Sequence, residues 1–318
     1  MNRGFVYLAL ATLGWSGNYI AGRYLAGAMP ALFLNGVRWA ISALILLAIA
    51  RLTRRRVGLR RHARELVLLG LVGMFLFSSL TYIGLRTVPA SQAGLISGTS
   101  PMFILLLGVA ALRERPGWTA WIGVLLSMAG VAILMGATAS PDGAAHGGPS
   151  GTASAASAAG DWFSQGPLVL LLASFTWALY TVLGKRWGGR LTPFEVTAGA
   201  AVYGAIPSLA FGLWSLRGQT LHMTPMAWVA LVYVSTVASV AAYFVWTSGV
   251  ERVGAGRAAP WMNLLPVWSV VLGVLLLHEH LTVRALIGGA VILAGALLTG
   301  VRSGKRPSAA AASERPGM

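Results

Sequence analysis

The feature that most constrains this chain is a series of ten apolar stretches, each long enough to cross a bilayer as a helix. Such a crossing takes about 20 apolar residues, because the hydrocarbon core offers no water to an exposed backbone. Charged residues make up only 10% of the chain, against about 25% in ordinary soluble domains, too few to cover a water-facing surface. The sequence therefore predicts an all-α integral membrane protein.

The predicted spans are joined by short links, with two exceptions. One is a basic loop from Arg51 to Arg64, and the other is a segment rich in Gly, Ala, Ser and Pro at 139–166, which we expect to be a flexible, non-cytoplasmic linker. Residues 302–318 are expected to form a disordered, basic cytoplasmic tail. The predicted span limits are 4–24, 30–51, 66–85, 90–112, 117–138, 167–186, 194–215, 225–248, 255–277 and 282–301.

The basic residues indicate which way these spans run. With the N-terminus in the cytoplasm, 19 Lys and Arg fall on that side and 4 on the other, while Arg38 lies within a span. Cytoplasmic loops of membrane proteins carry such an excess of basic residues. We therefore expect a multi-pass protein of a bacterial inner membrane with both termini cytoplasmic. The net charge of +16 lies in short loops, so we expect no nucleic-acid partner.

One segment occurs twice, half the chain apart. Residues 101–114 read PMFILLLGVAALRE and residues 266–279 read PVWSVVLGVLLLHE, so both carry the pattern P-x6-G-x5-E. The spans around them also align, which predicts two five-helix repeats at 1–138 and 167–301. Because five is odd, the second repeat enters the membrane from the opposite side. The sequence thus predicts ten transmembrane helices in two inverted-topology repeats, an arrangement common in secondary transporters.

These doubled motifs resemble the EamA family of the drug/metabolite transporter superfamily. The resemblance is carried by the paired first spans, in which Trp15 and Gly22 align with Trp177 and Gly184, by Arg38 in the second span, and by P-x6-G-x5-E before a glycine-rich fifth span. It covers about residues 4–138 and 167–301. It implies ten helices, a central cavity mainly between helices 1, 3, 4, 6, 8 and 9, and export or exchange of small metabolites such as amino acids.

Four predicted helices carry a face that mixes aromatic, hydroxyl and amide side chains at helical spacing. Hydrocarbon offers hydroxyl and amide groups no hydrogen-bond partner, so these faces either line a cavity or pack helices together. The Trp and Tyr residues can also belong to the aromatic belts at the membrane interfaces. Pro266 in the ninth span frees a backbone carbonyl one turn back, so its neighbours Trp261 and Asn263 are also candidates. The candidate solute-contacting residues are Trp15, Asn18, Tyr19, Arg38, Ser78, Tyr82, Trp177, Tyr180, Tyr243, Trp246, Trp261 and Asn263.

Three charged residues leave two interpretations open. Arg38 is the only charge well inside a span, where a guanidinium is costly and needs acceptors. It can bind a solute carboxylate or act as a gate, or it can snorkel or bond to helix-terminal carbonyls. Glu114 and Glu279 end helices, where carboxylates are disfavoured. Each either caps a following helix or pairs with an arginine, or it takes part in ion coupling or gating.

Other classes of protein fit the sequence less well. No acidic residue lies deep in a span, where a proton-driven exporter usually keeps one, so a uniporter or exchanger is favoured. The faces of aromatic, hydroxyl and amide groups suit neutral or zwitterionic solutes such as amino acids. The chain has no cysteine, so it has no metal-thiolate site and no cysteine nucleophile. The pattern G-x-S-x-G is absent and the five histidines lie in loops or at helix ends, which disfavours an enzyme. We expect no cofactor and no metal site. The expected partners are a small-molecule solute and the bilayer, with a monomer as the working unit; the alternative is a non-transporting scaffold or sensor.

Overall fold

A computed structural model describes residues 3–113, 116–138, 166–187, 190–253 and 258–300, and its elements there are helices. The first half contains α1 (Arg3–Leu25), α2 (Ala31–Leu52), α3 (Ala63–Leu69), η1 (Gly70–Phe77), α4 (Ser78–Gly84), α5 (Ala90–Ser97), α6 (Ser100–Leu112) and α7 (Trp118–Thr138). The second half contains α9 (Gly166–Arg186), α10 (Pro193–Ser215), α11 (Pro225–Thr236), η3 (Val237–Ala241), α12 (Ala242–Val253), η4 (Ala259–Asn263), α14 (Leu264–Leu277) and α15 (Val283–Gly300).

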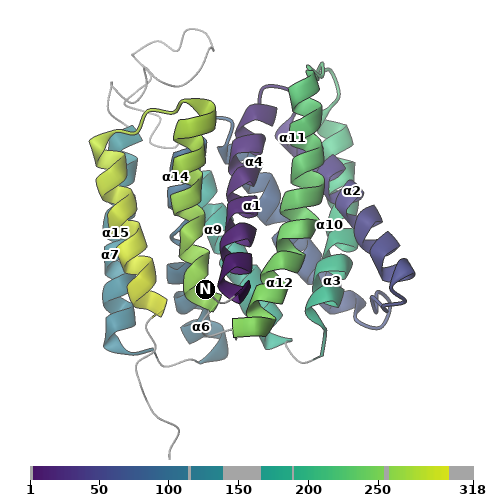
Figure 1. Cartoon of the computed structure of the whole chain (residues 1–318), viewed down its shortest axis with the longest axis horizontal. Helices are drawn as coiled ribbons and strands as arrows, with labels where there is room; N and C mark the ends of the chain where they lie inside the picture. The colour runs from purple at the N-terminus through teal and green to yellow at the C-terminus, as the bar shows by residue number, and fades with distance from the viewer. Residues whose placement is uncertain (1–2, 114–115, 139–165, 188–189, 254–257, 301–318) are drawn as a thin grey trace, which may run out of the picture.

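Joined end to end, these elements cross the bundle ten times within the described residues, with α3–η1–α4, α5–α6, α11–η3–α12 and η4–α14 each forming one crossing. In Figure 1, α1 begins and α15 finishes at the lower end of the bundle, whereas α7 finishes and α9 begins at the upper end. The second five crossings therefore run opposite to the first five. The predicted all-helical fold of ten spans in two inverted repeats is confirmed.

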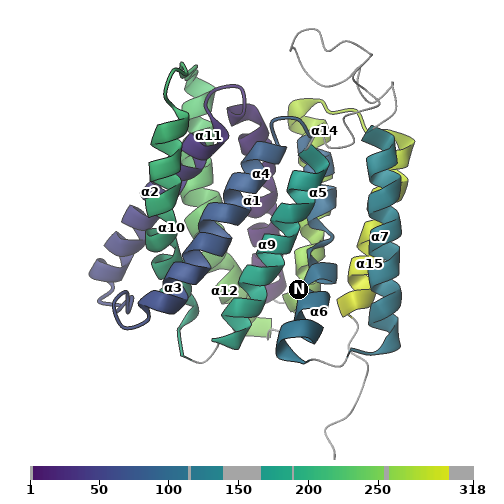
Figure 2. The same cartoon turned by 180° about the vertical axis from the view of Figure 1, so that it is seen from behind.

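The helix contacts follow the same inverted symmetry. The second helices of the two repeats, α2 and α10, pack together at one edge of the bundle, and the fifth helices, α7 and α15, pack together at the other (Figure 1). In the middle, α1 packs against α12 and α14, as α9 packs against η1, α4 and α6. The first helices lie on opposite faces, with α1 in front in Figure 1 and α9 in front in Figure 2.

Glycines let the edge helices approach at backbone distance. A Cβ added to Gly130 of α7 would lie 2.7 Å from the carbonyl oxygen of Gly288 on α15, and one added to Gly295 would lie 2.6 Å from the carbonyl oxygen of Gly123. Gly123 and Gly130 are the repeat equivalents of Gly288 and Gly295. Small residues commonly mediate close helix packing in membranes, where lipid gives no hydrophobic drive for association. The α7–α15 interface is therefore built twice from one motif.

Central and lipid-facing helices differ in composition. Six described helical segments are long and apolar enough to span a bilayer on their own: Ala31–Leu52, Ala63–Gly84, Ala90–Leu112, Gly166–Arg186, Pro193–Ser215 and Pro225–Val253. Three shorter apolar segments are Trp118–Leu134, Trp261–Leu277 and Val283–Leu298. The 23-residue α1 belongs to neither group, since Trp15, Asn18 and Tyr19 lower its hydropathy. It packs against α12, α14, α11 and α5 instead of facing lipid alone.

The backbone is irregular at matching places in the two repeats. The third crossing contains a π-helix in each, at Gly70–Phe77 and at Val237–Ala241. The fourth crossing is broken in each just before a proline: α5 stops at Ser97 before Pro101 in α6, and the 3-10 helix η4 gives way to α14 before Pro266. Interruptions of this kind leave backbone groups for other partners, and in transporters they often accompany substrate sites.

Candidate solute site at the centre of the bundle

A network of neutral groups surrounds Arg38 of α2. The guanidinium donates from Nε to the hydroxyl of Ser239 at 2.7 Å and from Nη1 to the hydroxyl of Tyr82 at 2.7 Å. The Tyr82 hydroxyl in turn donates to Oδ1 of Asn18 at 2.8 Å. Side chains of α1, α2, α4 and the π-helix η3 thus meet at one point, and they come from both repeats.

Arg38 is buried, with 7% of its surface exposed. Its guanidinium carbon lies 4.8 Å from the ring centroid of Trp39 and 5.6 Å from that of Tyr82, within cation–π range. Each partner that the described residues offer to this side chain is uncharged. The positive charge of Arg38 is therefore solvated by hydroxyls and aromatic faces, with no carboxylate from the described part of the chain.

The π-helix η3 explains how Ser239 reaches Arg38. The Ser239 hydroxyl donates to the carbonyl of Val234, five residues back, at 2.6 Å, and it accepts from Arg38. One turn of α2 later, the hydroxyl of Ser42 donates to the carbonyl of Ser235 at 2.9 Å. A wider turn leaves carbonyls without their usual partners, and α2 supplies one donor here. Ser239 lies four residues before Tyr243, a candidate from the sequence on the same crossing.

Aromatic residues of the first helices of the two repeats, α1 and α9, also make ring contacts. Trp15 of α1 lies 5.4 Å from Trp246 of α12 between ring centroids. Trp177 of α9 lies 5.4 Å from Tyr180 on its own helix, and 5.0 Å from the ring of Phe77. All of these rings except that of Phe77 were singled out from the sequence. The Trp15–Trp246 and Phe77–Trp177 contacts join the two repeats, whereas Trp177 and Tyr180 share one helix.

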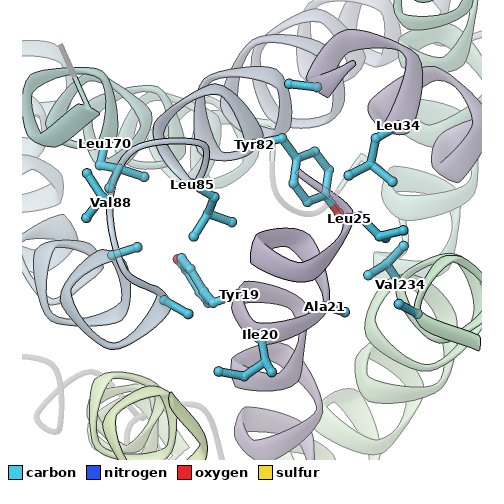
Figure 3. Packing of buried hydrophobic residues seen from close by; sticks show 14 of the residues in the cluster. Tyr19, Ile20, Ala21, Leu25, Leu34, Tyr82, Leu85, Val88, Leu170 and Val234 are labelled. Atoms are coloured by element: carbon cyan, nitrogen blue, oxygen red, sulfur yellow. The ribbon is translucent and has the colours of Figure 1, made fainter. Parts of the chain in front are cut away.

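Three further candidates lie nearby in different environments. Ser78 is buried and accepts a hydrogen bond from Nε1 of Trp39 at 3.2 Å. Tyr19 is buried in a large apolar cluster that also contains Tyr82 (Figure 3). Tyr243 donates from its hydroxyl to the carbonyl of Pro193 at 2.6 Å, at the start of α10. Ser78 and Tyr243 are thus engaged by protein groups in this conformation.

Trp261 and Asn263 lie apart from the Arg38 network. Trp261 stacks on Phe5 with ring centroids 5.3 Å apart. Both rings border an apolar hollow between α1 and α14 whose other lining residues are Val6, Ala9, Leu10, Leu13 and Trp268. Asn263 is the residue that precedes α14, and its side chain makes no cap hydrogen bond there. A second hollow lies on α10 at Ala210, Phe211 and Trp214. Neither hollow contains Arg38.

Sequence reasoning missed Asn35, which is fully buried on α2. Its Nδ2 donates to the carbonyl of Met74 at 3.1 Å, to the hydroxyl of Ser79 at 3.0 Å and to that of Ser208 at 3.1 Å. Met74 lies in the π-helix η1, so this amide satisfies a carbonyl that the wide turn leaves available. Asn35 and Arg38 are three residues apart and share a helix face, which was the signal in the sequence.

Glu279 caps a helix of the other repeat. Its two carboxylate oxygens accept from the backbone N–H groups of Ala90 at 2.7 Å and Ser91 at 2.8 Å, at the start of α5. A carboxylate suits a helix N-terminus because the first N–H groups lack partners there. The predicted capping role is therefore found, but on α5; the following helix, α15, uses the hydroxyl of Thr282. Glu114 lies outside the described residues.

The two ends of the bundle are packed differently around the network. At the upper end a large buried cluster gathers side chains from α1, α2, α4, α9 and α11, including Leu25, Leu85 and Leu170 (Figure 3). Toward the lower end, the described residues form a small buried cluster of Leu8, Val253 and Ala258 on the central helices and a larger one between α2 and α10 that includes Ala50 and Phe194. Along the face of α9 that carries Trp177 and Tyr180, Gly184 has open space where a Cβ would project.

Known proteins similar to this chain span nearly its full length. An uncharacterized transporter of Bacillus subtilis, YetK, is 26% identical, with 98% of this chain and 90% of that protein aligned. An uncharacterized transporter of Archaeoglobus fulgidus is 27% identical over 92% of this chain and 95% of that protein. A solved crystal structure of a protein shares the fold, with a TM-score of 0.63, 21% identity and coverage of 94% of this chain and 97% of that one.

The model of the EamA-like transporter family matches the chain twice, at residues 2–136 and at residues 164–301. The two matches correspond to the two five-helix repeats seen in the fold. Membership of a transporter family also confirms the expectation that the chain is not an enzyme. The chain is a multi-pass membrane transporter and belongs to the EamA-like transporter family.

Proposed function

We propose that this transporter exports or exchanges small neutral or zwitterionic metabolites, such as amino acids, across a bacterial inner membrane by alternating access. The observation that carries the proposal is the meeting of Asn18, Arg38, Tyr82 and Ser239 at the centre, contributed by both repeats. A polar network inside a transmembrane bundle is costly unless it serves a pathway. Two inverted repeats allow two related conformations, open to opposite sides, around one central site.

The packing of the two ends supports an inward-facing conformation. The upper cluster closes the bundle above the network, and a Cβ added to Gly22 of α1 would lie 2.8 Å from Tyr82, so α1 and α4 are in close contact there. The described aromatic side chains of Trp15, Trp177 and Trp246 are only partly buried. With the basic loops in the cytoplasm, the lower end in Figure 1 is the cytoplasmic one, so solute enters from that side.

The chain allows a clean test of this orientation, because it contains no cysteine. Arg56→Cys places a thiol in the loop after α2, and Arg217→Cys places one in the loop after α10, at opposite ends of the bundle. A membrane-impermeant maleimide added to intact cells should label Cys at 217 and spare Cys at 56 until the cells are permeabilised. Labelling of both sites, or of 56 alone, contradicts the proposed orientation.

Transport itself is tested by reconstitution. Purified protein in liposomes should take up some members of a panel of labelled amino acids, with and without a pH gradient. Trp15→Ala and Trp177→Ala should each lower the rate at least about tenfold if these rings contact solute, by analogy with buried aromatic anchors elsewhere. Trp214→Ala, on the exposed surface of α10, is the matched control. Wild-type protein that moves no member of the panel favours the scaffold or sensor alternative.

A further inference from the structure

The positive charge of Arg38 has no counter-charge among the described residues. The described carboxylates are those of Glu65, Glu195, Glu251 and Glu279, and none contacts Arg38. Glu195 bonds to Thr192 at the start of α10, and Glu279 bonds to backbone N–H groups at the start of α5. Since an isolated ion buried away from water is strongly disfavoured, something else has to balance this charge during the transport cycle.

Other arginines of the chain show what a structural arginine does here. Arg23 donates to the backbone carbonyls of Leu85 and Arg86 at 2.8 and 2.7 Å, and Arg252 donates to the carbonyl of Ser248 at 2.8 Å. These carbonyls are fixed acceptors with a large dipole. Arg38 instead bonds to the hydroxyls of Tyr82 and Ser239, both of which also donate elsewhere. The hydroxyls of Tyr82 and Ser239 therefore keep their own donated hydrogen bonds if the Arg38 guanidinium moves to another acceptor.

The guanidinium keeps donors available for a ligand. Arginine has five N–H donors, and the hydrogen bonds to the described residues use one on Nε and one on Nη1. The remaining ones lie on Nη1 and Nη2. This pair of nitrogens forms two parallel hydrogen bonds with a carboxylate, the strongest common geometry for such a contact.

The surroundings also define what the carboxylate is attached to. Asn18 links the network to the partly buried face of α1, and Trp15 lies one turn away on that face, paired with Trp246. An apolar or aromatic group fits against such rings. No acidic side chain of the described residues accompanies the network to hold an ammonium group. A free amino group is therefore tolerated but not required.

We infer that Arg38 is the anchor for a carboxylate of the transported solute, and that the solute class is a monocarboxylate with an apolar or aromatic body. This inference rests on the proposed transport function and changes its solute class in two ways: neutral solutes without a carboxylate are excluded, and carboxylate anions without an amino group are included. Tyr82 and Ser239 are positioning residues that orient the guanidinium. The solute supplies the counter-charge, so the loaded site is neutral and the empty site carries one positive charge.

Three probes that share a phenyl ring test this inference: 3-phenylpropionate and phenylalanine, which carry a carboxylate, and phenylalaninamide, which does not. The full chain, purified in detergent, is titrated with each while its thermal unfolding midpoint is followed. Both acids should raise the midpoint and the amide should leave it unchanged. Arg38→Gln should weaken the apparent affinity for 3-phenylpropionate by about 30-fold or more, because it removes one partner of a buried charge pair. Arg217→Gln, in an exposed loop, should have no effect.

The same titrations overturn the inference if the amide stabilises the wild-type protein as well as the acids do, or if no acid stabilises it. They also overturn it if Arg38→Gln binds 3-phenylpropionate as tightly as the wild type. If Arg38→Gln does not fold, the comparison of acid with amide on the wild type still decides. Liposome uptake separates the two proposals. Solute uptake without any preference for acids supports the transport function and contradicts the role of Arg38 as a carboxylate anchor. Acid binding without uptake contradicts the transport function and supports Arg38 as a carboxylate-binding residue.

Discussion

The two repeats of this transporter share their backbone irregularities but not their charge. Each has a π-helix in its third crossing and a break before a proline in its fourth. Each fourth crossing also ends on a non-glycine residue in the left-handed conformation, Arg113 with φ 54° and His278 with φ 53°. Arg38, by contrast, corresponds to a position near Ala201, which is fully buried among apolar side chains of the α2–α10 interface.

This difference separates two kinds of feature. Under the proposed alternating access, a duplicated backbone irregularity serves a motion that both repeats have to make, because the repeats exchange roles. Under the proposed anchor role, the single charge of Arg38 serves a ligand that binds once per cycle at one central point. The predictions below test the shared features by breaking one copy and the unshared feature by removing it.

The largest effect is expected at the α7–α15 interface. Gly130→Leu should lower the free energy of unfolding by about 3 kcal/mol, at the upper end of overpacking effects, because its side chain would meet the backbone of α15. Gly295→Leu, the same change in the other repeat, should cost about as much. Thermal unfolding and size-exclusion profiles in detergent measure both. Gly184→Leu, where the space is open, is the control and should fold normally. An equal loss of unfolding free energy in all three variants would contradict the claim that close glycine packing at the α7–α15 interface stabilises the fold.

The next effect concerns stability in the absence of solute. Arg38→Met should raise the free energy of unfolding by about 1–4 kcal/mol, as when buried charges are replaced by apolar groups, while abolishing carboxylate binding. Tyr82 and Ser239 remain satisfied, since each still donates to another acceptor. Chemical denaturation in mild detergent compares the variants, with Arg217→Met as the control. A clear loss of stability in Arg38→Met would instead assign Arg38 a structural role.

A smaller effect is expected at the cap that joins the repeats. Glu279→Gln should lower the unfolding midpoint by the equivalent of about 1 kcal/mol, because the neutral amide loses the charge-assisted bonds to α5. Glu251→Gln, exposed near the end of α12, should have no measurable effect. The unfolding midpoint of Glu114→Gln, the change at the equivalent position of the first repeat, tests whether the two glutamates contribute equally to stability. A Glu279→Gln protein as stable as the wild type would show that the carboxylate cap on α5 does not stabilise the fold.

The smallest effect belongs to a feature of one repeat only. Helix α10 begins with a capping box in which the Thr192 hydroxyl accepts from the N–H of Glu195, whereas α2 begins after Pro30 without a side-chain cap. Thr192→Ala should therefore cost about 0.5 kcal/mol, at the lower end of the effects of losing a cap, measured by thermal unfolding. Thr236→Ala, whose hydroxyl bonds only within its own helix, is the control. Glu195 lies in the first turn of this helix, where its negative charge suits the unpaired N–H groups.

Much of the fold could be predicted because the relevant signals are local. The span limits follow from runs of apolar residues, and the inverted arrangement follows from an odd number of spans in each repeat. The partner of Glu279 could not be predicted, because the start of α5 lies 188 and 189 residues away along the chain. The π-helices were also missed, since an inserted turn changes no residue type and barely disturbs the apolar pattern. Asn35 was overlooked because its partners lie on η1, α4 and α10.

The sequence by itself determined that the helices lie in lipid, how many times the chain crosses the bilayer and that the five-helix unit is duplicated. Hydrophobicity and repetition can both be read directly along the order of residues. Only the tertiary structure decided that Arg38, which lies well inside its span, is surrounded by the hydroxyls of Tyr82 and Ser239 and the rings of Trp39 and Tyr82. Whether a buried charge is neutralised depends on groups that converge from distant helices. Those positions are set by close glycine contacts and irregular turns, which composition and spacing do not encode.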